Sequence, residues 1–339
     1  MRATRLAALA AILAAACSLV TRLAPPTDVL CTPEIVADVG DAGLTSVVVD
    51  SVTNAAYFSG TTSNAVYSVA LDAPAGSKAN VVMTLDAPRR LAIANGSLGK
   101  DQLDTYVFAT AQGASGNGGL FVLAPDASQS PIVSGGSVHA DGLFVRGAYA
   151  PSIYWLASDP NNAGSQIRSS AVDGSTSVLA DVDASLHDIV ATDALTIWTT
   201  TKVGASVIGF GDAGAKSTPC AGVIAYQPAG VVPARLYATS ETACNGRYVI
   251  QWLPADDPSA APTQFATARV NGPTSMVYDG AKYLYWANNT DGTIARRTVD
   301  ETKDEEAVAT SPAPPHQLAY LAGVLYWTTD TALVRCALR

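Results

Sequence analysis

The feature that most constrains this chain is a short pattern that recurs along it. An apolar run ends in an aromatic residue, a polar turn follows, and a second run with alternating side chains comes next. The clearest copy spans 284–300 and reads LYWANNTDGTIARRTVD, and shorter matches begin at 153 (IYW) and 325 (LYW). A turn rich in Asn, Asp and Gly between two such runs predicts an antiparallel hairpin. A hairpin repeated along the chain predicts a repeat architecture.

Seven aromatic residues mark the same place in successive copies of this pattern, at the end of the first run of each hairpin. Their spacing ranges from 39 to 50 residues. Each repeat divides into four strand-like runs separated by Gly, Pro, Asn and Asp, with no helical periodicity between them. The sequence therefore predicts an all-β fold, a seven-bladed β-propeller. The seven aromatic anchors are Phe58, Phe108, Trp155, Trp198, Tyr237, Trp286 and Trp327.

The two ends of the repeat array predict how the ring closes. The last repeat has three strand-like runs, 317–320, 324–327 and 332–338, and then the chain stops without a fourth. A spare run at 34–38 precedes the first complete repeat. We therefore expect this N-terminal strand to form the outer edge of the last blade.

Composition limits the classes of partner. The 339-residue chain has only 14% charged residues and a formal net charge of −9. Nucleic-acid binding proteins concentrate positive charge on one face, so this balance argues against a nucleic-acid partner. Abundant small residues and turns are typical of an exported all-β protein.

The first residues read as an export signal. Arg2 and Arg5 precede an apolar run at 6–16 that is shorter than the ~20 residues needed to cross a bilayer. Ala-Ala-Ala before Cys17 resembles a bacterial lipobox, which implies a diacylated N-terminal cysteine; cleavage by an ordinary signal peptidase is the alternative. We expect 1–16 to be a signal peptide, 17–28 a lipidated tether and 29–339 the propeller domain. We also expect the lipoprotein to be anchored in the outer membrane, on its periplasmic or cell-surface side.

Four further cysteines in an exported chain suggest two disulfides, with three possible pairings. Strand direction places Cys31 and Cys336 together at one edge of the last blade. It places Cys220 and Cys244 on the opposite face, on neighbouring blades. We therefore predict the pairs Cys31–Cys336 and Cys220–Cys244. The cysteines and histidines show no metal-ligand spacing, so neither a metal nor a cofactor is predicted.

A set of polar residues is expected at one mouth of the central channel. The first strand of each repeat is expected to line the central channel. Its first residue should lie eleven positions before the anchor aromatic, which gives His187, Ser275 and His316. Such residues suit an anion, a metal or a sugar; alternatively they are the ordinary polar ends of strands. His139 and Asp188 are neighbours of this set. The predicted ligand-binding residues are Arg90, Asp141, His187 and His316 at the mouth, with Asn288, Asn289 and Asp291 beside it.

The hairpin at 284–300 and the motif YWTTD at 326–330 resemble the YWTD repeat of low-density-lipoprotein-receptor-type propellers, and more loosely the NHL and gluconolactonase propellers. The chain also resembles uncharacterised bacterial envelope lipoproteins. The resemblance implies a propeller, and since YWTD propellers have six blades it makes six the alternative to seven.

Signatures of catalysis are sparse. A gluconolactonase-type calcium site needs Glu, Asn and Asp on inner strands, and Glu34 and Glu241 are not on inner strands. We therefore predict a non-catalytic, monomeric cell-envelope lipoprotein that binds a protein, a peptide or a polysaccharide. The alternative is a propeller enzyme, a hydrolase, lactonase or lyase, that works at the channel mouth.

Overall fold

The computed structural model describes most of the chain after residue 28. The described residues contain 28 β-strands and no helix. Accordingly, the described segments include no helix that is long and apolar enough to cross a bilayer. They are 29–96, 104–113, 118–134, 139–146, 151–158, 165–182, 185–191, 196–202, 205–210, 215–217, 222–239, 247–257 and 260–338.

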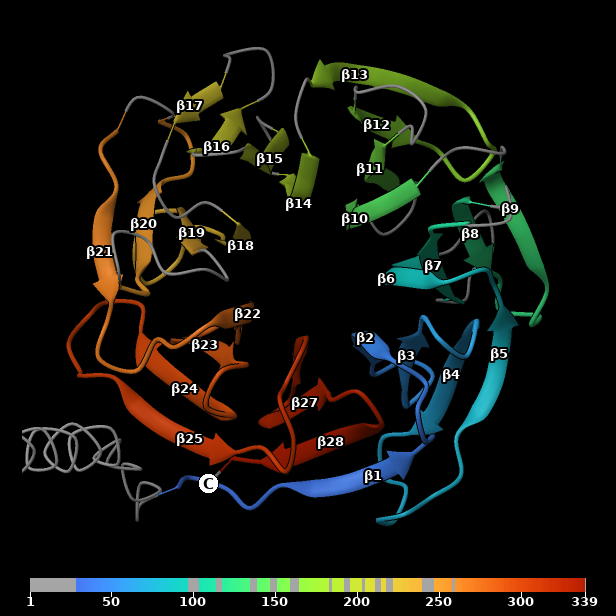
Figure 1. Cartoon of the computed structure of the whole chain (residues 1–339), viewed down its shortest axis with the longest axis horizontal. Helices are drawn as coiled ribbons and strands as arrows, with labels where there is room; N and C mark the ends of the chain where they lie inside the picture. Colours follow the sequence, from blue (N-terminus) through green and yellow to red (C-terminus); the bar gives the residue numbers. More distant parts are fainter. Residues whose placement is uncertain are drawn as a thin grey trace, which may run out of the picture.

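Among these residues the strands form seven four-stranded antiparallel sheets, which are arranged as blades around a central axis (Figure 1). The chain is thus an all-β propeller, as predicted. Its described strands give seven sheets rather than the six blades of YWTD propellers.

The first four blades follow the chain. Blade 1 comprises β2 (Leu44–Asp50), β3 (Ala55–Gly60), β4 (Ala65–Ala70) and β5 (Asn80–Thr84). Blade 2 comprises β6 (Pro88–Gly96), β7 (Asp104–Ala111), β8 (Gly119–Leu123) and β9 (Gln129–Ser134). Blade 3 comprises β10 (His139–Arg146), β11 (Ser152–Ser158), β12 (Ser165–Ser170) and β13 (Thr176–Val182). Blade 4 comprises β14 (Ser185–Ala191), β15 (Thr196–Lys202), β16 (Ala205–Phe210) and β17 (Ala215–Ser217).

The last three blades complete the ring. Blade 5 comprises β18 (Val223–Gln227), β19 (Arg235–Thr239), β20 (Ile250–Pro254) and β21 (Thr263–Ala266). Blade 6 comprises β22 (Pro273–Tyr278), β23 (Tyr283–Asn288), β24 (Thr293–Thr298) and β25 (Glu306–Thr310). Blade 7 comprises β26 (Leu318–Leu321), β27 (Val324–Thr328), β28 (Ala332–Ala337) and, from the other end of the chain, β1 (Glu34–Asp38).

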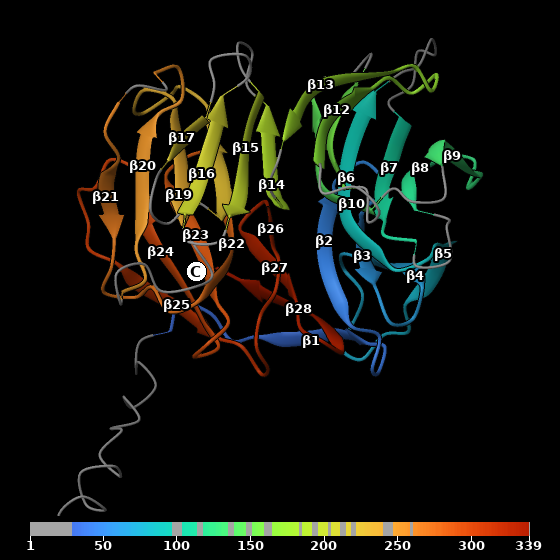
Figure 2. The ribbon, with the colours of Figure 1, turned by 45° about the horizontal axis from the view of Figure 1, so that its top comes forward.

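Each blade runs from an inner strand a, next to the axis, through b and c to an outer strand d (Figures 1 and 2). Because neighbouring strands are antiparallel, the b–c turns and the d-to-a connections lie on one face, which we call the upper face. The a–b and c–d turns lie on the lower face. The hairpin of β23 and β24 shows the predicted turn, in which Gly292 adopts φ +71° and donates its N–H to Asn288 O at 3.0 Å. That left-handed conformation favours glycine.

The anchor aromatics pack between blades. Trp155 of blade 3 shares a cluster with Phe108 and Leu120 of blade 2, and all three are fully buried. Burying such rings supplies much of the apolar area that joins one blade to the next. Their polar edges are satisfied as well: Trp327 Nε1 donates to Ser311 Oγ at 2.8 Å across the gap between blades 6 and 7.

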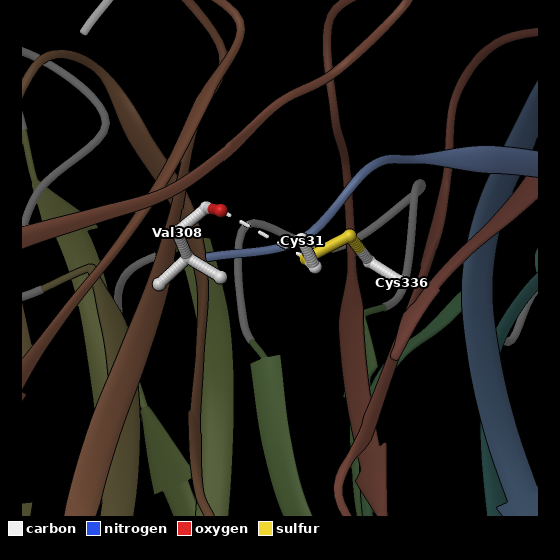
Figure 3. Close-up of a disulfide and its surroundings, with 3 residues drawn as sticks. All are labelled: Cys31, Val308 and Cys336. Atoms are coloured by element: carbon white, nitrogen blue, oxygen red, sulfur yellow. Dashed lines mark hydrogen bonds between the residues drawn. A yellow bond between two sulfur atoms is a disulfide. The ribbon is translucent and has the colours of Figure 1, made fainter. Parts of the chain in front are cut away.

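The predicted closure of the ring is confirmed. Strand β1 pairs with β28, with Glu34 opposite Arg335 and Asp38 opposite Ala332. A disulfide joins Cys31, just before β1, to Cys336 near the end of β28, with 5.7 Å between their Cα atoms (Figure 3). The predicted partners Cys220 and Cys244, and the predicted lipidation site Cys17, lie outside the described residues.

Candidate active site at the upper face

The inner strands share an irregularity near their upper ends. In five blades the pairing of strand a with strand b shifts there, so that strand a carries residues with no partner opposite. Such a bulge turns a side chain away from the regular sheet direction and is common beside functional sites. The shifts fall between Leu44 and Ser46 in blade 1, Pro88 and Leu91 in blade 2, Ala140 and Leu143 in blade 3, Leu186 and Asp188 in blade 4, and Pro273 and Ser275 in blade 6.

Blade 7 has the same arrangement just before β26. His316 N donates to Thr328 O at 2.8 Å, and Thr328 N donates to Gln317 O at 3.2 Å, so two residues face one. In blade 5, by contrast, β18 pairs with β19 without a shift. We call the extra residues the bulge positions: Thr45, Arg89 and Arg90, Asp141 and Gly142, His187, Thr274 and His316.

The four residues predicted at the channel mouth, Arg90, Asp141, His187 and His316, all occupy bulge positions. The side chains of Asp141 and His187 lie outside the description, as does that of His139 at the start of β10. Their binding role therefore stays a prediction. For Arg90 and His316 the side chains are described and form the basis of the site.

The eleven-residue count was wrong by one residue in blade 6. Thr274, not Ser275, holds the bulge position there. In blade 6 the last paired residues before the a–b turn are Tyr278 and Leu284, and in blade 4 they are Ala191 and Thr196. The a–b turn of blade 6 is therefore one residue longer, which moves the count from the anchor aromatic by one position. Ser275 is buried and accepts the N–H of Leu318 in the next blade at 3.0 Å.

His316 forms a pair with Asp330 from the b–c turn of its own blade. Its Nε2 lies 2.9 Å from Asp330 Oδ1, and the two side chains are 29% and 73% exposed. A carboxylate that hydrogen-bonds one imidazole nitrogen orients the ring and selects its tautomer. The pair therefore combines a defined orientation with access from solvent. In the sequence Asp330 is only the last residue of the YWTTD motif, and nothing in that motif indicates that it lies beside His316.

The neighbouring blade holds the backbone of His316 in position. Thr274 Oγ1 lies 3.0 Å from Pro315 O and 2.8 Å from His316 O. Asn289 Nδ2, from the b–c turn of blade 6, donates to Pro315 O at 3.4 Å. The predicted residue Asn289 is thus beside the bulge positions, where it supports His316.

Two other predicted ligand residues serve the local structure. Asn288 is fully buried, and its side chain bonds Arg269 O at 2.9 Å, Thr293 Oγ1 at 2.8 Å and Asn271 N at 2.9 Å. Asp291 closes the turn by accepting the N–H of Thr293 at 3.0 Å and the Nδ2 hydrogen of Asn271 at 3.0 Å. The turn uses polar atoms of both side chains, and their role as ligand-binding residues stays a prediction.

Asp188, expected as a carboxylate beside His187, joins two blades instead. Its Oδ1 accepts the N–H of Ile189 at 3.0 Å, and its Oδ2 accepts the N–H of Ile224 in blade 5 at 3.1 Å. Ser46 plays the same part between blades 1 and 2, since it accepts the N–H of Leu91 at 3.0 Å. These acceptors satisfy inner-strand amides that would otherwise lack a partner.

The described residues do not assemble a gluconolactonase-type calcium site. The described bulge side chains come from Thr, Arg and His, which are not the Glu, Asn and Asp of that site. Glu34 lies on the outer strand β1, where Arg335 pairs with it at 2.8 Å, and Glu241 lies outside the description. No group of three His, Cys, Asp or Glu among the described residues is placed to hold a metal ion.

A pocket of about 730 Å³ lies elsewhere, on the outer rim of blade 7. Strand β1, the c–d turn of blade 1 and the end of β25 line it. Its one ionisable residue, Asp38, already accepts the N–H of Gly40 at 2.9 Å. This rim pocket offers no pair of groups for proton transfer, which favours the upper face as the site.

No protein-family model and no curated protein sequence matches the chain, but its fold matches solved structures. A streptogramin B lyase covers 91% of this chain and 97% of its own, with a TM-score of 0.64 at 13% identity. A catalytically inactive histidine-to-alanine variant of virginiamycin B lyase from Staphylococcus aureus, with quinupristin, covers 88% and 96%, with a TM-score of 0.60 at 11% identity. A gluconolactonase from Xanthomonas campestris covers 91% and 95%, with a TM-score of 0.51 at 13% identity.

These matches correct the functional prediction. We expected a non-catalytic binding protein, but the solved structures that this chain resembles are lyases and gluconolactonases, which favour the enzyme alternative. At this level of identity the likeness itself establishes the fold, and a shared fold does not imply a shared reaction. The chain has the propeller fold of these structures and presents a histidine–carboxylate pair at one face.

Proposed function

We propose that this protein is a propeller enzyme that opens a lactone or another cyclic ester at its upper face, with His316 as the residue that moves the proton. The observation that carries the proposal is the 2.9 Å contact between His316 Nε2 and Asp330 Oδ1 at a bulge of the inner strand. Histidine is the side chain that most often acts as a general acid or base, and a hydrogen bond to a carboxylate fixes its ring orientation and tautomer.

The contact with Asp330 assigns the roles of the two ring nitrogens. A carboxylate only accepts hydrogen bonds, so the neutral imidazole donates from Nε2 and keeps its lone pair on Nδ1. Within the described residues nothing hydrogen-bonds to Nδ1 of His316. Nδ1 is therefore the atom that takes the proton, while Asp330 orients the ring through Nε2.

Two reactions of a cyclic ester begin with this proton transfer. In hydrolysis Nδ1 takes a proton from water, the oxygen of water attacks the carbonyl carbon, the ring C–O bond breaks, and the leaving alkoxide takes the proton back. In elimination Nδ1 takes a proton from the carbon next to the one that bears the ester oxygen; a C=C bond forms while the C–O bond breaks, and the carboxylate leaves. Hydrolysis adds one water to the product mass and elimination adds none.

The names of the structural neighbours support this choice of substrate class. A gluconolactonase is by its name a lactone-opening enzyme, and the streptogramin B and virginiamycin B enzymes are named lyases. A histidine-to-alanine change accompanies loss of catalysis in one of them. His316 is our candidate for a residue with such a role in this chain.

The test is turnover of a panel of lactones and cyclic depsipeptides, followed by mass spectrometry of the products. We expect His316→Ala and Asp330→Asn to lower kcat at least about a hundredfold, the usual loss on removing acid–base catalysis. Asp304→Asn is the matched control, because Asp304 is exposed in the c–d turn of blade 6 on the lower face. Wild-type activity in the His316→Ala enzyme, with folding intact by circular dichroism, would overturn the proposal.

We further propose that the enzyme is exported and anchored through an acylated Cys17 in the outer membrane. The disulfide between Cys31 and Cys336 supports an oxidising compartment, because such bonds persist mainly outside the cytosol. Cys17→Ser should abolish incorporation of labelled palmitate and release the protein from membranes. Membrane association that survives the change, without label in the wild type, would contradict the anchor.

A further inference from the structure

Two arginines stand side by side at the bulge of blade 2. Arg89 donates from Nε at 3.0 Å, and also from Nη2, to Oε1 of Gln112, which follows β7 in the b–c connection of the same blade. The guanidinium of Arg90 makes no hydrogen bond or ion pair with any described residue, while its backbone N–H donates to Thr110 Oγ1 at 3.1 Å. The Arg89 guanidinium is thus held in a fixed direction, and no described residue pairs with that of Arg90.

No carboxylate among the described residues pairs with either of these two guanidinium groups. Gln112 is a neutral amide, so it orients Arg89 without cancelling its charge. Elsewhere in the described chain, at the flanks and rim of the blades, arginines pair with carboxylates, as Arg296 does with Glu306 at 2.8 Å and Arg335 does with Glu34 at 2.8 Å. Two guanidinium groups without a carboxylate partner among the described residues form a local site for an anion in a chain of net charge −9.

The arginine pair lies close to the histidine pair across blade 1. Leu44 N donates to Asp330 O at 3.1 Å, and the next residue, Thr45, donates from Oγ1 to Arg89 O at 3.0 Å. The dipeptide Leu44–Thr45 and these two hydrogen bonds therefore connect Asp330 O to Arg89 O. The distance between these two carbonyl oxygens is at most about 14 Å. The arginine side chains of blade 2 and the His316 side chain of blade 7 extend from these two backbones. A small molecule is therefore long enough to contact both.

We propose that Arg89 and Arg90 bind a carboxylate group of the substrate, so that the enzyme acts on cyclic esters that carry a free acid. This inference rests on the proposed function of His316. A guanidinium presents two parallel N–H donors that match the two oxygens of a carboxylate, and such charge-assisted pairs are about twice as strong as neutral hydrogen bonds. The anion fixes one end of the substrate while the ester bond lies toward His316.

The kinetic test compares one lactone that carries a free carboxylate with its methyl ester. In Arg90→Gln we expect the ratio of kcat/KM for the acid to kcat/KM for the methyl ester to fall about tenfold to a hundredfold, the factor that one charged hydrogen-bonded contact supplies. Arg247→Gln is the matched control: Arg247 is exposed in the b–c connection of blade 5 on the same face, and its loss removes the same charge. The ratio should not change there.

A binding test that needs no turnover separates this inference from the proposed function. Isothermal titration of the wild-type enzyme with glutarate should show saturable binding that His316→Ala and Arg247→Gln retain and Arg90→Gln loses. Glutarate binding lost in Arg90→Gln, with turnover unaffected by His316→Ala, would leave the carboxylate subsite standing and remove the proposed catalytic role. Binding that survives Arg90→Gln, or that falls equally in Arg247→Gln, would overturn the subsite and leave His316 untouched.

Discussion

Asp50, at the lower end of β2, is a buried carboxylate on the face opposite the candidate site. Its Oδ1 accepts hydrogen bonds from Val52 N at 3.1 Å and Asn95 Nδ2 at 3.0 Å. Its Oδ2 accepts from Thr53 N at 2.8 Å, Thr53 Oγ1 at 2.5 Å and Thr105 Oγ1 at 2.7 Å. Burial raises the pKa of Asp50, but the hydrogen bonds from Thr53, Thr105 and Val52 outweigh it and hold the pKa below its usual value. The ionised form therefore stabilises the fold.

Asp50→Asn should lower the free energy of unfolding by about 2 to 3 kcal/mol at pH 7, since donors that now meet a carboxylate would meet an amide. Because the folded pKa lies below the unfolded value of about 3.9, the stabilisation is fully present above that pH and is lost as the pH falls through the folded pKa. The difference between variant and wild type should therefore shrink below about pH 4. Urea unfolding at several pH values measures it, with Asp256→Asn as an exposed control. An equal effect at both sites would contradict the assignment.

Strand β1 has one face buried in the core and one face exposed. Val36 and Ala37 are almost completely buried and pack in one cluster with Leu44 and Tyr326, whereas Ile35 is 39% exposed. On its outer edge β1 meets the c–d turn of blade 1, where Gly76 N donates to Ile35 O at 3.1 Å. The strand is therefore paired on both edges, which protects it from pairing with another chain.

Val36→Asp should lower the free energy of unfolding by about 3 kcal/mol or more, because it buries a charge without a partner at the seam of the ring. The same change at the neighbouring exposed position, Ile35→Asp, should cost no more than about 0.5 kcal/mol. Thermal or urea unfolding of the two variants compares them directly. If both melted with the wild type, β1 would not contribute to the closed ring.

The whole ring is closed by pairing between its ends and by one covalent bond. Cys31 and Cys336 are 305 residues apart, and both are buried between blades 6 and 7, where Cys31 Sγ also lies 3.8 Å from Val308 O. A bond across so long a loop restricts the unfolded chain strongly, by nominally about 5 kcal/mol. A propeller can open only at the seam between its first and last strands, and the bond lies there.

The double variant Cys31→Ser with Cys336→Ser should unfold at a lower urea concentration than the oxidised wild type, with a loss of up to about 5 kcal/mol. Wild type that has been unfolded in reductant and then refolded in it should match the variant. Val36→Asp in the serine background separates strand pairing from the covalent bond. Equal urea midpoints for the oxidised wild type and the double variant would show that closure by β1 alone is sufficient.

Much of the architecture could be read from local patterns. The aromatic anchors recur at 39 to 50 residues, and turn residues such as Asp291 and Gly292 mark the hairpins, so strands and repeats followed from spacing. The missing fourth strand of the last repeat and the spare run at 34–38 predicted the closure and the Cys31–Cys336 bond. Counting from the anchors also located Arg90 and His316 on equivalent bulges, because repeats place equivalent residues at equivalent positions.

The roles of the side chains were decided by contacts between blades, which a one-dimensional pattern does not contain. Asn288 was predicted as a ligand residue and Asp188 as a carboxylate beside His187, and the structure shows hydrogen bonds from Asn288 to Arg269 O and from Ile224 N to Asp188. Asp330 became the partner of His316 only because a b–c turn folds over the start of an inner strand. The repeat period thus comes from the order of residues, while the acid–base pair comes from the ring that brings separate loops to one face.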